Sequence, residues 1–257
     1  FNKKGPARDL EPFFNYKVTP GFSTPDWAKG AVFYQIYVDR FANGDPSNDV
    51  LNREYIYIKE PSKKIDDWYC YPEQMDVRNF YGGDLQGVLD HLDYLKELGV
   101  DVIYLNPIFV SPSNHKYDIQ DYDYIDPHYG KIVVDEGNTL PDWENNNMNA
   151  SKYISRVTDK RNLEASNEFF VHFVEEVHKK GMRVILDGVF NHCGSFNKWM
   201  DAERIYENQY GYEKGAFVDA NSPYRHFFKF YNQNAWPYND DYDGWGGHKT
   251  LPKLNYE

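Results

Sequence analysis

Residues 166–190 read SNEFFVHFVEEVHKKGMRVILDGVF, and this stretch decides the fold. Its first part predicts a helix over 166–180, with Ser166 as the N-cap and Gly181 as the residue that ends the helix. Its second part, 182–190, is an apolar run that predicts a buried strand. A helix that passes into a buried strand through a single glycine is typical of alternating helix and strand units.

The same alternation continues toward the N-terminus. The β-branched and aromatic run at 31–38 predicts a strand, and 100–105 (VDVIYL) predicts another. Between them, leucines and valines spaced by three and four residues over 85–98 predict an amphipathic helix that starts after Asp84 and ends at Gly99. The order strand, helix, strand, helix, strand predicts parallel strands that are covered on both faces and joined by right-handed crossovers.

The connections between these elements are unequal in length. Helix-to-strand turns are minimal, whereas long polar connections follow the strands at 39–83, 106–165 and 191–257. A (β/α)8 TIM barrel has this asymmetry, and the strand-to-helix turns lack the GxGxxG pattern of a doubly wound nucleotide-binding sheet. Because a barrel takes about 250 residues for eight units, we expect 31–190 to form the first three units of a partial barrel. We expect 1–30 to be a linker or the tail of a preceding domain.

The composition of the 257 residues narrows the function. A net charge of −12 argues against nucleic acid as a partner, and no run reaches the roughly 18 apolar residues of a membrane helix. Cys70 and Cys193 are expected to be two ordinary thiols. Aromatic residues make up 18% of the chain, and many lie in polar loops, where flat apolar faces with polar edges suit a sugar ring.

Four motifs resemble the α-amylase family of glycoside hydrolases. They are FYQIYVDRF (33–41), NHKYDIQDYDYIDPHYG (114–130), LDGVFNH (186–192) and LPKLN (251–255), and the last is similar to the MPKLN of the neopullulanase and cyclomaltodextrinase branch. The resemblance implies hydrolysis of α-1,4-glucosidic bonds in starch-derived oligosaccharides by a retaining mechanism, with α-1,6 bonds as a further candidate. It also favours a cytoplasmic location and, for the full-length protein, a homodimer.

The motifs supply the candidate substrate-binding residues. Asp187 lies in an apolar strand, where a carboxylate needs a partner. It is either a structural ion-pair residue or, as the resemblance implies, the aspartate that organises the site by binding an arginine near the nucleophile. The resemblance further assigns Tyr117 as the ring that stacks under the reacting sugar. It makes His115 and His192 the donors of hydrogen bonds to sugar hydroxyls.

A loop after the first strand predicts a calcium site. Asn43, Asp45, Asn48 and Asp49 crowd oxygen-bearing side chains into a short turn, although an Asx-rich turn without metal has the same composition. The loop is not an EF-hand. The resemblance favours structural Ca²⁺, with the carbonyl of Gly82 and the carboxylate of Asp84 completing the site.

The catalytic carboxylates are not among the assigned residues. In the family they follow the fourth, fifth and seventh strands, so we expect them beyond residue 257 and expect this chain alone to be inactive. Residues 191–257 then correspond to a small domain inserted after the third strand, which forms one wall of the substrate cleft. Four aromatic residues in or next to this range either pack or line the cleft: Phe190, Trp199, Trp236 and Trp245. The alternative is a catalytically silent carbohydrate-binding module of the same fold.

Overall fold

The computed structural model describes residues 3, 5–6, 8 and 12–256. The chain divides into two units, Phe1–Ala31 and Val32–Glu257. The first unit contains η1 (Pro12–Phe14) and η2 (Asp26–Ala28), and the remainder of its described backbone is largely irregular. Residues 1–2, 4, 7 and 9–11 of the predicted linker or tail lie outside the described residues, so that assignment stays a prediction.

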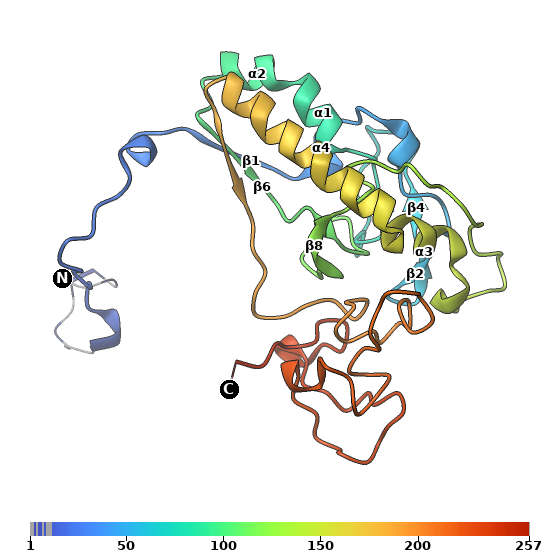
Figure 1. Ribbon diagram of the computed structural model, residues 1–257. Helices are drawn as coiled ribbons and strands as arrows, with labels where there is room; N and C mark the ends of the chain where they lie inside the picture. The colour runs from blue at the N-terminus through green and yellow to red at the C-terminus, as the bar shows by residue number, and fades with distance from the viewer. Residues whose placement is uncertain (1–2, 4, 7, 9–11, 257) are drawn as a thin grey trace. The chain divides into compact units, whose positions relative to one another are not determined.

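The second unit is built on a sheet of three parallel strands in the order β1-β6-β9 (Figure 1). The strands are β1 (Phe33–Ile36), β6 (Val102–Leu105) and β9 (Arg183–Leu186). Ile36 lies opposite Leu105, which in turn lies opposite Leu186, so the three strands end level. This confirms the predicted α/β class with parallel strands, and the loops that follow the strands leave from the same edge. Closure into a barrel stays a prediction.

The strands are shorter than predicted. β1 does not reach Val38, because the backbone turns into η3 (Val38–Arg40). β9 ends at Leu186, not at Phe190: the N–H of Asp187 donates to the carbonyl of Leu105, and the residues that follow leave the sheet. Asp187 therefore lies at the end of the strand and not inside it.

Two helix predictions need correction. The predicted helix over 85–98 is two helices, α1 (Leu85–Asp90) and α2 (Leu92–Glu97), separated at His91, whose backbone is not helical. Asp84 caps α1 as predicted, with its carboxylate 2.7 Å from the N–H of Gly87.

The second correction concerns the helix that was predicted to start at Ser166. α4 (Lys160–Lys179) starts earlier, and Asp159 caps it by accepting from the N–H of Arg161. Ser166 is buried inside α4, where its hydroxyl donates to the carbonyl of Asn162 and accepts from the N–H of Lys131. The side chain is therefore used for packing against a loop.

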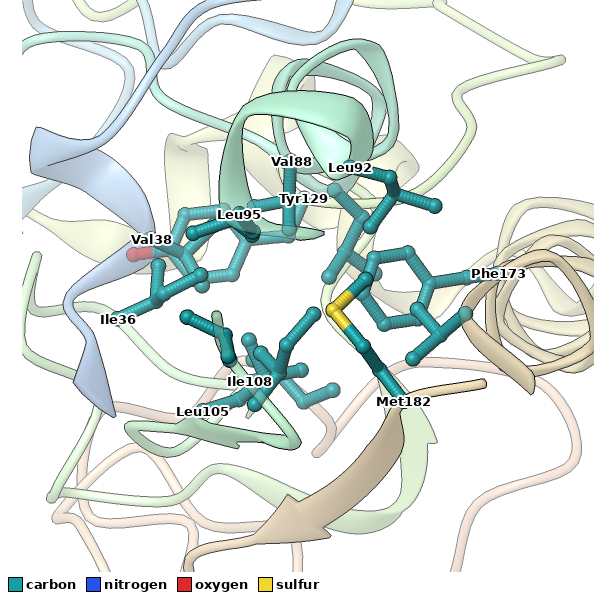
Figure 2. Packing of buried hydrophobic residues seen from close by; sticks show 14 of the residues in the cluster. Ile36, Val38, Val88, Leu92, Leu95, Leu105, Ile108, Tyr129, Phe173 and Met182 are labelled. Carbon is teal, nitrogen blue, oxygen red and sulfur yellow. The ribbon is translucent and has the colours of Figure 1, made fainter. Parts of the chain in front are cut away.

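The main hydrophobic core lies between the sheet and the helices. Figure 2 shows side chains from α1, α2 and α4 meeting those of β1 and β6, with Phe173 of α4 close to Met182. Figure 1 shows α4 lying beside α1 and α2. Helices were predicted on both faces of the sheet, but Phe33 is 47% exposed and Gln35 is exposed, so part of β1 lacks a cover among the described residues.

A buried ionic network lies behind the loop that follows β6. Lys116 Nζ is 2.6 Å from Asp126, whose other carboxylate oxygen is 2.8 Å from His128. The second ring nitrogen of His128 is 2.8 Å from Glu54, which also accepts from Arg156 of α3 (Ser151–Thr158). Alternation of the charges keeps each buried ion paired.

Besides η3, α3 and the start of α4, the described residues of the long connections form only short elements. They are η4 (Pro46–Asn48), η5 (Asn147–Asn149), η6 (Arg225–Phe227), η7 (Trp245–Gly247), and the strand pairs β2 (Ile56–Tyr57) with β3 (Glu60–Pro61), β4 (Lys63–Lys64) with β5 (Asn79–Phe80), and β7 (Phe109–Val110) with β8 (Asp121–Ile125). Residues 191–256 pack a core of their own around Cys193, Met200 and Phe228. Cys70 and Cys193 are free thiols. Within the described residues, no helix is long and apolar enough to cross a membrane.

Candidate functional site

The level strand ends bring the predicted substrate-binding residues together. Tyr117 lies in the loop after β6, and Asp187 directly follows β9. The Tyr117 hydroxyl donates to Asp187 Oδ2 at 2.8 Å. Tyr104, on β6, lies close enough to Asp187 for the carboxylate to raise the pKa of its hydroxyl. The Tyr117 phenol therefore holds the carboxylate at the end of β9, with a second phenol nearby.

His192 is held by both of its ring nitrogens. Nε2 is 3.0 Å from the carbonyl oxygen of Tyr117, and Nδ1 is 2.6 Å from the side-chain amide of Asn191. The ring stacks on Trp245 with centroids 5.9 Å apart. Burial lowers the pKa of His192, so the ring is neutral at pH 7, with Nε2–H donating to the carbonyl and Nδ1 accepting from the amide.

His115 lies on the other side of Tyr117. Its Nδ1 accepts from the backbone N–H of Tyr117 at 3.1 Å and lies 3.2 Å from the hydroxyl of Ser113. Within the part of the chain that the structure describes, Nε2 has no hydrogen-bond partner. Because Nδ1 is an acceptor, the neutral ring carries its proton on Nε2, where it is available to a ligand.

The electrostatics keep the two phenols protonated. Burial and the hydrogen bond to Asp187 raise the pKa of Tyr117 to about 12. The carboxylate of Asp187, together with burial, also raises the pKa of Tyr104. Asp187 makes no salt bridge with any described residue, so the arginine that the resemblance implies is not seen among them, and that role stays a prediction.

An aromatic pocket of about 370 Å³ adjoins these residues. Tyr122 connects the two, because its hydroxyl donates to the carbonyl of His192 at 2.8 Å and its ring stacks on Trp199 with centroids 5.1 Å apart. The pocket is lined by Tyr122, Phe190, Trp199, Phe227, Leu254, Asn255 and Tyr256. Four aromatic residues were expected either to pack or to line the cleft. Phe190 and Trp199 line the pocket, Trp245 stacks on His192, and Trp236 packs in the core formed by residues 191–256.

The predicted calcium ligands fall into two groups. In the first, Asn43 Nδ2 donates to Asp49 Oδ1 at 2.8 Å, and a Cβ added to Gly82 would lie 2.5 Å from each of these atoms. Nearby along the loop, the side-chain oxygen of Asn48 is buried and has no hydrogen-bond partner. A close-packed glycine and an unpaired buried oxygen fit a hard cation. Asp49 also pairs with Lys64 at 2.6 Å.

In the second group, the carboxylates of Asp84 and Asp45 already make hydrogen bonds or ion pairs within the protein. Asp84 accepts from the N–H groups of Gly44, Asp45 and Gly87. Asp45 accepts from Ser47 and pairs with Lys131 at 2.9 Å. No cluster of three or more His, Cys, Asp or Glu side chains suited to a metal occurs among the described residues. A cation here would therefore depend on the amide and carbonyl oxygens of the first group.

Comparison with known families gives a match to the α-amylase catalytic domain, described as "Alpha amylase, catalytic domain", over residues 35–136 and 165–257. The chain belongs to this α-amylase family. Residues 137–164 lie outside the match, and they include η5, α3 and the beginning of α4. The four motifs from which the resemblance was inferred all lie wholly or almost wholly within the matched residues.

Relatives of this α-amylase-family chain carry the names of glycoside hydrolases. An amylopullulanase of Thermoanaerobacter thermohydrosulfuricus is 36% identical over 90% of the chain and 14% of its own length. Neopullulanase 2 of Thermoactinomyces vulgaris is 40% identical over 67% of the chain and 21% of its own length. The type III pullulan hydrolase of Thermococcus kodakarensis has a similar structure, with a TM-score of 0.62 and 29% identity over 92% of this chain and 34% of that one. The chain thus spans a minor part of each relative.

Reasoning from the sequence missed three residues of this α-amylase-family site. Tyr104 was included only as part of a predicted strand, and Tyr122 was given no role in the site, yet Tyr104 lies near Asp187 and Tyr122 contacts His192. Trp245 was left undecided. The pairing of the strands would have predicted that Tyr104 lies near Asp187, because Tyr104 on β6 lies opposite Ile185, two residues before Asp187. No local pattern marks Tyr122 or Trp245, since their positions depend on how the irregular segment 191–256 folds back.

Proposed function

We propose that the protein containing this chain hydrolyses α-1,4-glucosidic bonds, and α-1,6 bonds as well, in starch-derived oligosaccharides. The observation that carries the proposal is the convergence of Tyr117, His115, Asp187 and His192 at one edge of the sheet, next to an aromatic pocket. The names of the relatives, which include pullulan and maltodextrin hydrolases, support this substrate class.

Tyr117 is proposed to stack its ring on the apolar face of the sugar at the bond that is cut. Its hydroxyl is held by Asp187, which fixes the plane of the ring at little entropic cost on binding. The Nε2–H of His115 is proposed to donate to a sugar hydroxyl. For His192 to do the same, its Nε2–H must leave the carbonyl of Tyr117, so sugar binding would exchange one hydrogen bond for another.

The proposed mechanism retains the configuration of the sugar. Such cleavage uses two carboxyl groups about 5–5.5 Å apart, one as nucleophile and one as acid and base. Asp187 is proposed to organise the site and not to attack the sugar, because its Oδ2 already accepts a hydrogen bond from Tyr117. We place both catalytic carboxylates on later strands of a TIM barrel, outside this chain, of which β1, β6 and β9 would be the first three.

We also propose a structural calcium ion that joins the loop at 43–49 to the segment at 82–84. Asn43, Asn48, Asp49 and the carbonyl of Gly82 would hold it, and the unpaired oxygen of Asn48 supports this assignment. Asp45 and Asp84 would position the loop through their bonds to backbone N–H groups. The ion would connect two long loops and take no part in the chemistry. A homodimer of the full-length protein stays a prediction.

The test is the action of the complete polypeptide on maltotriose and pullulan. Proton NMR of the first product should show the α-anomer, as retention requires. Tyr117→Ala should lower kcat/KM at least about thirtyfold, about 2 kcal/mol, because a stacked ring is lost. Tyr94→Ala, which removes an exposed ring on α2, is the matched control and should change nothing.

Three results would contradict parts of the proposal. Binding of maltotriose without cleavage would favour the silent carbohydrate-binding module. Equal effects of Tyr117→Ala and Tyr94→Ala would remove Tyr117 from the site. Turnover by the 257-residue chain alone would refute the placement of the carboxylates outside it.

A further inference from the structure

A second cavity, of about 500 Å³, lies between the β2-β3 hairpin, the loop at 145–147 and the segment after β9. We call it the hairpin pocket. None of the four site residues lines it. Its walls combine apolar side chains of Ile56 and Ile58 with polar groups of Asn145, Ser195 and Glu203. This mixture is typical of small-molecule sites and unlike the largely aromatic wall of the pocket beside His192.

The hairpin that forms one wall has a strained tip. Tyr57 pairs with Glu60, so Ile58 and Lys59 form a two-residue turn. Both have positive φ, 49° and 64°, which such turns require and which normally selects Asn or Gly. A β-branched residue at positive φ is an outlier, and strain of this kind collects at ligand clamps. Ile58 is nevertheless 37% exposed, so burial of its side chain does not explain why an isoleucine occupies this turn position.

Two polar groups in the pocket have unused hydrogen-bonding capacity. Ser195 is 5% exposed, and its hydroxyl has no hydrogen-bond partner. Glu203 accepts from the amide of Asn147 at 2.9 Å through Oε2, whereas Oε1 makes no hydrogen bond within the described residues. An unsatisfied buried hydroxyl is rare in a folded protein and requires an explanation such as a ligand.

The hairpin is fixed against the pocket by one side chain. Asn147 accepts from the N–H of Ile56 at 2.8 Å and donates to its carbonyl at 2.9 Å, while the same amide reaches Glu203. Asn145 and Asn147 belong to residues 137–164, outside the family match. This pocket is therefore built in part by a segment that the family alone does not supply.

We propose that the hairpin pocket binds a short, neutral α-glucan of about the size of maltose, separately from the cleft at Tyr117. The proposal rests on the proposed function, which makes α-glucans the ligands that the protein meets. Sugar hydroxyls can donate to Glu203 Oε1 and accept from Ser195 and Asn145, and the C–H face of the sugar can pack on Ile58. An anion would be repelled by Glu203, and one carboxylate is too few for a divalent cation.

The experiment measures maltose binding to the complete protein by calorimetry in a Tyr117→Ala background, where the cleft is disabled. One maltose per chain should bind. Adding Glu203→Gln should weaken association at least about tenfold, because an acceptor of sugar hydroxyls is lost while the size is kept. The matched control is Glu60→Gln, an exposed residue of the same hairpin that does not line the pocket, and it should have no effect.

A second variant separates binding from folding. Ser195→Ala removes a hydroxyl that has no hydrogen-bond partner among the described residues, so the melting temperature should not fall, yet maltose association should weaken several-fold. If the Glu203→Gln variant fails to fold, the Ser195→Ala variant still tests whether the hairpin pocket binds maltose. Equal maltose affinity in Glu203→Gln and Glu60→Gln, or no binding in the Tyr117→Ala background, would overturn the proposal.

The failure of the proposed function would look different. Maltose binding that depends on Glu203, in a protein that does not cleave maltotriose, would contradict hydrolysis and support the pocket. Cleavage of maltotriose by the protein, with no maltose binding in the Tyr117→Ala background, would support hydrolysis and contradict the hairpin pocket.

Discussion

Replacing Lys116 by methionine should cost the protein about 3–5 kcal/mol of unfolding free energy, the range for removing one partner of a buried ion pair. Lys116 is 1% exposed, and its Nζ lies 2.6 Å from Asp126, 3.0 Å from the carbonyl of Ser111 and 4.5 Å from the centre of the Tyr129 ring. Methionine keeps most of the volume of the side chain. The loss therefore reports the charge left uncompensated on Asp126 and not a cavity.

The effect should depend on pH with a defined sign. Burial alone would raise the pKa of Asp126, but the charges of Lys116 and His128 outweigh it and hold this pKa well below its usual range. A carboxylate with a depressed pKa stabilises the fold above about pH 4 and loses that contribution as the pH falls. Without Lys116 the pKa of Asp126 should rise. The gap in stability between the two proteins should therefore be larger at about pH 7 than at about pH 4.

Urea unfolding followed by tryptophan fluorescence measures both quantities. Lys179→Met is the matched control: Lys179 pairs with Glu176 on the exposed face of α4, and its removal should leave the midpoint essentially unchanged. The double variant Lys116→Met with Asp126→Asn should lose less than the sum of the single losses, because the two side chains share one interaction. A loss at Lys116 below about 1 kcal/mol, or one independent of pH, would refute the assignment of a buried charged pair.

Three further outcomes are expected. Tyr117→Phe keeps the ring but removes the bond to Asp187, so kcat should fall several-fold while KM stays nearly constant; a changed KM with constant kcat would mean that the hydroxyl only helps to bind substrate. Chelation of calcium should lower the melting temperature of the complete protein, and Asp49→Ala should abolish that sensitivity. A melting temperature that chelator does not change would contradict the proposed calcium site. Burial raises the pKa of Asp201 to about 8, so its contribution to stability is present below about pH 4 and is lost as pH rises through about 8. Asp201→Asn should flatten the fall in melting temperature over this range, and a parallel fall in both proteins would contradict the shift.

The period of apolar residues predicted the three parallel strands, whereas the resemblance supplied the site residues. Once three parallel strands end level, Tyr117 and Asp187 must lie at one edge. The ends of the elements could not be predicted as well. The apolar pattern continues through His91, yet the backbone breaks there, where its Nδ1 lies 2.7 Å from the carbonyl of Gly87.

Side chains with two uses were the other source of error. Ser166 has the chemistry of an N-cap, but Asp159 caps the helix, and Ser166 instead bonds the backbone of a neighbouring loop. Asp84 suits both a helix cap and a calcium ligand; the structure confirms the predicted cap, and its role toward calcium stays a prediction. The chemistry of such a side chain allows several hydrogen-bond partners, and the fold determines which of them it contacts.

Arg156 gives residues 137–164 a structural importance that their absence from the family match would not suggest. Its guanidinium reaches out of α3 to Glu54 and to the backbone carbonyl of Asp49, both at 2.9 Å. A deletion of residues 137–164 would remove Arg156 and leave the buried carboxylate of Glu54 with His128 and the backbone N–H of Leu51 as partners. A protein shortened in this way should therefore carry a neutral residue of similar shape in place of Glu54. Otherwise the unpaired buried carboxylate would destabilise the fold.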